Sequence, residues 1–171
     1  AFFLELSERF EAGGEESMDP NLLPTAMNLL DRYLSIKSCD AVMFQQAALI
    51  ALQISSKIHG FRPIVPPLLV RLSNNRFTPR QLLVMEKDML MTLRWDLHPS
   101  TVVRVLDHFK LLVLDGVNLN STPSFDQHAR ECLDITLADY GMLQFPPSYI
   151  AWAVLEKAFA LTRAHGESAL V

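Results

Sequence analysis

Two charged residues stand inside otherwise apolar segments, and their chemistry needs an explanation. Lys57 lies near the end of the segment Asp40–Ile58, which presents apolar or small side chains on every side when it is turned as a helix. Glu86 lies in the middle of the apolar stripe of the next long helix. A carboxylate in such a stripe needs a partner, or it lies at an edge that another molecule covers. Lys57 and Glu86 are therefore the first candidates for a binding site built on charged hydrogen bonds.

Each of the two residues also has a purely structural explanation. A lysine near a helix C-terminus is favoured by the helix dipole, and its aliphatic stem can lie along apolar surface while the ammonium stays in water. Glu86 can be a buried acid that is satisfied within its own chain, including by Lys57 itself. Residue types alone favour these structural explanations, because most such charges are structural.

The sequence contains no recognisable catalytic motif. The five histidines share no spacing typical of metal ligands. The chain has no glycine-rich phosphate loop and no nucleophile elbow. We therefore expect a protein that is not an enzyme and that uses neither a metal nor a cofactor. The alternative, an all-α enzyme, requires a convergent polar pocket that the sequence does not reveal.

Composition restricts the partners and the compartment. The chain has 171 residues, half of them apolar, and a formal net charge of -4. Nucleic-acid binding usually requires a basic face, so nucleic acid is not the expected partner. The two cysteines are too few for a disulfide framework. Together with the absence of a recognisable signal peptide, this favours a reducing compartment, nuclear or cytoplasmic.

Helix signals run through the whole chain, and no alternating strand pattern of useful length occurs, so the expected class is all-α. Polar residues interrupt the segment Asp40–Ile58 too often for a membrane span, so other helices must enclose it. Asp40 is its expected N-cap. The other expected helices are Ala1–Glu11, Pro20–Ser35, Leu68–Leu72, Pro79–Leu93 after a capping box at Thr78–Gln81, Ser100 or Thr101 to Leu114, Ser124 to about Tyr140, and Pro147–Ala164. A break at Pro99 predicts two domains, residues 1–97 and 98–171.

Three stretches in register resemble the cyclin box. Asn28–Ser35 (NLLDRYLS) resembles the D-R-aromatic-L-S signature, and Ala51–Ile58 (ALQISSKI) resembles the A-S-K ending, with Ser55 where alanine is usual. Phe77–Leu97 resembles the pattern that begins with M-E and ends with aromatic-x-L. Pro146–Ala151 (PPSYIA) resembles the P-S-x-I-A start of the second cyclin fold. The resemblance implies a five-helix, cyclin-like fold around a buried central helix, followed by a truncated second repeat made of its first three helices.

The resemblance also implies a binding role for particular residues. Residues matching Lys57 and Glu86 contact the regulatory helix region of a cyclin-dependent protein kinase in this family. The apolar positions that resemble the family's kinase-facing contacts are Ile58, Leu90, Trp95 and Leu97. Positions that resemble the family's substrate-docking site are Phe2, Glu5 and Gln45, but Ala41 stands where a basic residue often occurs.

The function that the resemblance implies is that of a regulatory subunit that binds and activates a cyclin-dependent kinase in cell-cycle control. Kinase substrates or inhibitors are further expected partners, and neither nucleic acid nor a membrane is. The alternative is a cyclin-fold transcription adaptor or scaffold that acts without a kinase. Members of that kind that touch DNA should be basic, and this chain is not.

Overall fold

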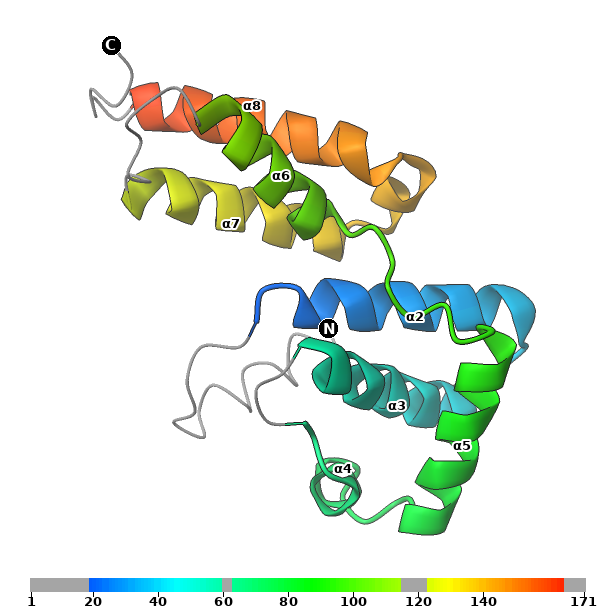
Figure 1. Cartoon of the computed structure of the whole chain (residues 1–171). Helices are drawn as coiled ribbons and strands as arrows, with labels where there is room; N and C mark the ends of the chain where they lie inside the picture. The colour runs from blue at the N-terminus through cyan, green and yellow to red at the C-terminus, as the bar shows by residue number, and fades with distance from the viewer. Residues whose placement is uncertain (1–18, 60–62, 115–122, 165–171) are drawn as a thin grey trace. The chain divides into compact units, whose positions relative to one another are not determined.

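The computed structural model describes residues 19–59, 63–114 and 123–164, and every regular element in these ranges is helical (Figure 1). The expected all-α class is therefore confirmed. The helix expected over Ala1–Glu11 lies outside the described residues. The chain divides into two compact units that meet between Pro99 and Ser100.

The first unit contains four described helices: α2 (Leu22–Ile36), α3 (Ala41–His59), α4 (Pro66–Leu72) and α5 (Pro79–Thr92). Helix α3 packs against both α2 and α5, and α4 packs against α5 (Figure 1). Every residue of α3 from Ala47 through Ser56 is buried. Ala47, Ala48 and Ala51 are completely buried, and their small side chains let the neighbouring helices approach closely. The buried central helix expected from the sequence is thus present.

Among the described residues, the enclosure of α3 is incomplete at its start. Val42, Met43 and Phe44 are 42%, 38% and 41% exposed, although the apolar pattern predicted burial along the whole helix. Asp40 caps this end as expected, since its Oδ1 accepts hydrogen bonds from the backbone N–H groups of Val42 and Met43. The cap provides an acceptor for free backbone N–H groups of the first turn, so these groups need no hydrogen-bond partner from another segment.

The buried polar residues of α3 fasten other segments to it. The Gln53 amide donates to the carbonyl oxygen of Ile64 at 3.2 Å. The Ser56 hydroxyl accepts from the backbone N–H of Ile64 at 2.9 Å, and the Ser55 hydroxyl donates to the carbonyl oxygen of Leu22 at 2.6 Å. Every one of these polar side chains therefore has a partner inside the core, as burial requires.

No helix in the described part of the chain has the length and apolar character needed to span a membrane.

Two helix starts differ in how well the sequence predicted them. Thr78 and Gln81 form the expected capping box at α5, each side chain accepting from the backbone N–H of the other. Helix α2 begins at Leu22 and not at Pro20, because Asp19 and Asn21 form a turn before it. In that turn the Asp19 carboxylate accepts from the backbone N–H of Asn21 at 2.7 Å.

The second unit contains α6 (Val102–Leu114), α7 (Pro123–Ala138), a short 3-10 helix η1 (Tyr140–Gln144) and α8 (Pro147–Ala164). Helix α8 packs against both α6 and α7. The bounds of α8 are those predicted. Helix α7 ends earlier than expected, because the Asp139 side chain accepts from the backbone N–H of Gly141 and starts the new turn η1.

Candidate kinase-binding site

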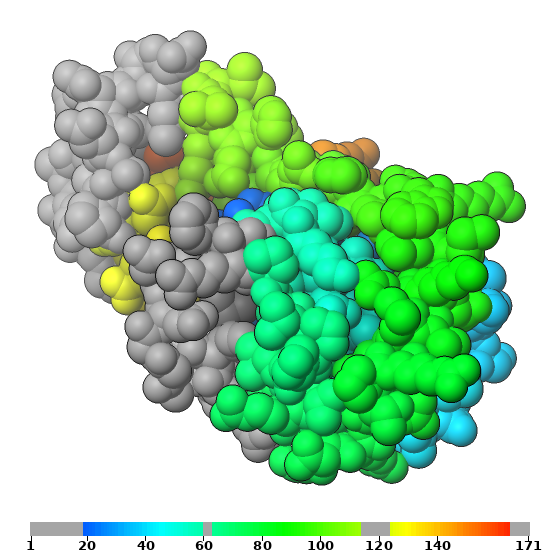
Figure 2. Space-filling view, turned by 60° about the horizontal axis from the view of Figure 1, so that its bottom comes forward, coloured from blue at the N-terminus to red at the C-terminus, as the bar shows by residue number. Residues whose placement is uncertain are grey.

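Lys57 and Glu86 come together at the junction of α3 and α5. Lys57 is in the last turn of α3 and Glu86 is in the middle of α5, and the Lys57 ammonium donates to Glu86 Oε1. The Lys57 side chain is 43% exposed, whereas that of Glu86 is only 16% exposed. The carboxylate is therefore held mostly inside, and the ammonium beside it reaches the surface. Figure 2 shows the turquoise surface of α3 next to the green surface of α5 on one face of the unit.

The apolar residues expected around this pair divide into two kinds. Ile58, Leu90 and Leu97 are partly buried and pack against the core of the first unit. Trp95 is different, because 64% of its surface is exposed. Leu90 lies one helical turn beyond Glu86 on α5, so it extends the same face. The Trp95 backbone lies next to Leu90, since its N–H donates to the Leu90 carbonyl oxygen at 3.0 Å.

The turn that carries Trp95 has an unusual backbone. Arg94 and Trp95 have φ angles of 51° and 61°, in the left-handed region. Residues other than glycine, asparagine and aspartate rarely adopt this region, at a cost of roughly 1–2 kcal/mol each. The sequence gives no glycine to signal such a turn, and strained backbone of this kind tends to occur at functional positions.

Arg32 of α2 holds the residue that follows Trp95. Its Nη1 donates to the Asp96 carbonyl oxygen at 2.9 Å, and its Nη2 donates to Asp96 Oδ2 at 2.7 Å. The two ends of this contact are 64 residues apart in the chain. Arg32 belongs to the D-R-Y-L-S segment, but the sequence showed nothing of what its guanidinium contacts.

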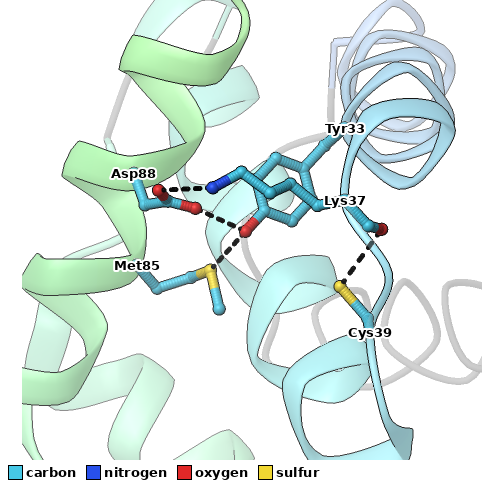
Figure 3. A network of polar contacts seen from close by, with 5 residues as sticks. All are labelled: Tyr33, Lys37, Cys39, Met85 and Asp88. Carbon is cyan, nitrogen blue, oxygen red and sulfur yellow. Dashed lines mark hydrogen bonds and ion pairs between the residues drawn. The ribbon is translucent and has the colours of Figure 1, made fainter.

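A second polar network joins α2 to α5 (Figure 3). The buried Tyr33 hydroxyl donates to Asp88 Oδ2 at 2.6 Å, and the Lys37 ammonium donates to Asp88 Oδ1 at 3.1 Å. The hydrogen bond from Tyr33, helped by Lys37, lowers the pKa of Asp88 below its ordinary value. Burial and the neighbouring Asp88 carboxylate raise the pKa of Tyr33, so the phenol keeps its proton. The sequence alone does not predict this network, because Tyr33 and Asp88 lie 55 residues apart along the chain.

The acid dependence of stability provides a test of this network. Because folding lowers the pKa of Asp88, its contribution to stability is present above the ordinary aspartate pKa of 3.8 and is lost as the pH falls through the lower, folded value. We expect Asp88→Asn to lower the urea midpoint at about pH 7, and the difference from wild type to shrink below about pH 4. Tyr33→Phe should reduce the same pH dependence only in part, since Lys37 remains. A difference that stays constant from neutral to acid pH would contradict this assignment.

The substrate-docking positions expected from the sequence are only partly described. Phe2 and Glu5 lie outside the described residues. Gln45 is on the first half of α3, where its Oε1 accepts from Arg76 Nη1 at 2.9 Å. Its amide oxygen is therefore already engaged by a residue of the same chain.

Groups capable of other chemistry remain separate in the described ranges. Among these residues no three His, Cys, Asp or Glu side chains are placed so that they could hold a metal ion. Cys39 and Cys132 are half-buried free thiols, and burial raises the pKa of each. A raised thiol pKa disfavours the reactive thiolate.

Comparison with known proteins identifies the class to which this fold belongs. The family model described as "Cyclin, N-terminal domain" matches residues 10–98, slightly more than half of the chain. The chain therefore belongs to the cyclin family.

Individual relatives come from animals and plants. The chain is 28% identical over 137 residues to G1/S-specific cyclin-D1 of Danio rerio, covering 80% of this chain and 46% of that protein. It is 31% identical over 140 residues to G1/S-specific cyclin-D3 of Rattus norvegicus, with the same coverage. It is 30% identical over 151 residues to Cyclin-B2-2 of Arabidopsis thaliana, covering 88% of this chain and 32% of that protein. The chain thus spans about half the length, or less, of these curated relatives.

A solved structure supports the fold. The X-ray structure of a viral cyclin from herpesvirus saimiri superposes with a TM-score of 0.72, at 23% sequence identity, over 88% of this chain and 64% of that one. The expected cyclin-like architecture is confirmed by this likeness.

Proposed function

We propose that this chain is the regulatory part of a cell-cycle kinase complex, and that it binds and activates a cyclin-dependent protein kinase. The observation that carries the proposal is the Lys57–Glu86 pair, which reaches the surface at the α3–α5 junction of a cyclin-family chain. Membership of the cyclin family supports a cyclin-dependent kinase as the partner. The names of the relatives, such as G1/S-specific cyclin-D1, support a role in the cell cycle. In this proposal the chain does no chemistry itself and acts in the nucleus, the cytoplasm or both.

The charged pair is suited to bind backbone groups of a partner. The Lys57 ammonium has three N–H donors, of which one goes to Glu86. Its exposed fraction leaves the remaining donors accessible to carbonyl oxygens of a docked helix. The Glu86 carboxylate beside it can accept from backbone N–H groups and fixes the direction of the ammonium. Ile58, Leu90, Leu97 and the exposed Trp95 would supply the apolar contact area around the pair.

Activation follows if the surface binds the active kinase conformation more tightly than the inactive one. A ligand shifts a conformational equilibrium only by its difference in affinity for the two states. The chain would therefore act as a preformed surface, complementary to the active position of the kinase's regulatory helix. Substrate or inhibitor docking through Phe2, Glu5 and Gln45 would be a separate contribution to the same complex.

The proposal can be tested by co-purification. The tagged 171-residue chain is incubated with a panel of purified cyclin-dependent kinases, and retained kinases are identified by mass spectrometry and assayed for phosphorylation of a general substrate. We expect at least one kinase to be retained and its activity to rise on addition of the chain. Failure to retain any member of a full panel would contradict the proposal and favour a kinase-independent scaffold. A gel-shift assay at low salt then separates a DNA-binding adaptor from a protein scaffold.

A further inference from the structure

The turn after α5 has an unfavourable backbone conformation, and its own residues do not include the glycine that would relieve it. Leu93 ends α5, and Arg94 and Trp95 follow in the left-handed region. Local hydrogen bonds close the turn: the Trp95 N–H donates to the Leu90 carbonyl oxygen, and the Asp96 N–H donates to that of Leu93, both at 3.0 Å. These bonds resemble a helix C-terminal motif that normally relies on glycine. With arginine and tryptophan at the left-handed positions, the local bonds must work against the backbone preference.

A long-range contact supplies the missing support. The Arg32 guanidinium binds both the backbone carbonyl and the side-chain carboxylate of Asp96, which fixes the position and the direction of that residue together. The planar guanidinium suits this forked contact, which a lysine could not reproduce. Leu97, one residue further on, packs against the core. Trp95 is therefore anchored on one side by the α5 end and on the other by Asp96 and Leu97, with its ring largely exposed.

We infer that Arg32 is a positioning residue for the partner-binding surface: it holds Asp96 so that the left-handed turn presents Trp95 outward beside Leu90. The inference rests on the proposed function, since the partner that Trp95 meets is the kinase. Arg32 itself need not touch the partner. Without it, the turn samples other conformations, and the apparent affinity is the intrinsic affinity multiplied by the fraction of molecules in which Trp95 is correctly placed.

The experiment combines a spectroscopic and a binding measurement. The chain has two tryptophans, so Trp152→Phe leaves Trp95 as the single reporter of the turn. In this background we expect Arg32→Ala to lower the steady-state fluorescence anisotropy of Trp95. We expect it also to weaken binding to the kinase retained in the co-purification by about three- to tenfold. Lys37→Ala is the matched control, because it removes another exposed ion pair, between the residue that caps the end of α2 and Asp88 of α5, and it should change neither value.

Relief of the backbone penalty separates positioning from direct contact. Glycine adopts the left-handed region freely, so Arg94→Gly in the Arg32→Ala chain should restore affinity to within about twofold of the Arg94→Gly single variant. Affinity that is lost with Arg32 but not restored by Arg94→Gly would overturn the inference, as would unchanged Trp95 anisotropy in Arg32→Ala. The anisotropy measurement needs no kinase. If the chain retains no kinase but Arg32→Ala still lowers the Trp95 anisotropy, the proposed function is refuted. In that case the partner-binding part of the inference fails, and the positioning of Trp95 by Arg32 stands.

Discussion

Lys57→Ala and Glu86→Ala are each expected to abolish detectable kinase binding while the helical circular dichroism stays unchanged. In the complex the pair would be desolvated, where truncating one member of a hydrogen-bonded charge pair costs about 2–5 kcal/mol. That cost corresponds to a loss of roughly 30-fold to several thousand-fold in affinity. In the free chain the Lys57 side chain is 43% exposed and that of Glu86 is 16% exposed. Removing either partner leaves the other partly solvated, at a cost of about 1–3 kcal/mol, which is less than the stability of a typical domain. Binding should therefore be lost without unfolding, as measured by pull-down and calorimetry.

A charge exchange distinguishes a partner contact from an internal ion pair. The double variant Lys57→Glu with Glu86→Lys restores an ion pair within the chain but reverses the charges that the kinase meets. If the pair were only structural, the double variant would bind as wild type does. We expect it to bind no better than the single variants. Normal binding and activation by both alanine variants would show that the site lies elsewhere.

Ile50→Ala is expected to cause a large loss of stability in the first unit. Ile50 lies in the enclosed part of α3 and is completely buried. Truncating a buried isoleucine removes its transfer free energy and leaves a cavity, at a cost of about 2–5 kcal/mol in the free energy of unfolding. Urea denaturation followed by circular dichroism should show this as a lower midpoint with an unchanged slope.

The same helix provides the control for that measurement. Val42 is in the exposed first turn of α3, so Val42→Ala should lower the free energy of unfolding by less than about 1 kcal/mol. Equal effects at the two positions would mean that α3 is not enclosed as described. The pair of variants thus tests the gradient of burial along α3, which hydrophobic pattern alone did not predict.

Local signals in the sequence predicted the features that depend on neighbouring residues. The capping box at Thr78, the Asp40 cap and the bounds of α8 were all correct, because each depends on side chains within one helical turn. The two charged residues that stood out in apolar segments also proved to be neighbours in space.

Features that depend on distant residues were missed. The Tyr33–Asp88 and Arg32–Asp96 contacts join residues 55 and 64 positions apart. No local pattern specifies such contacts, because they exist only once α2 and α5 are packed. The left-handed turn was missed for a related reason, since the sequence lacks the glycine that usually marks it. What sustains it is a guanidinium on another helix.

The backbone at Arg94 is left-handed, with a φ of 51°. A D-amino acid prefers this left-handed region as strongly as an L-amino acid prefers the right-handed helical region, because the two residues are mirror images. A chain assembled by semisynthesis with D-arginine at position 94 would therefore keep the guanidinium and lose the steric conflict. A D-residue at this single position would therefore rigidify the turn that carries Trp95, which no L-residue with a side chain can do without the same steric conflict.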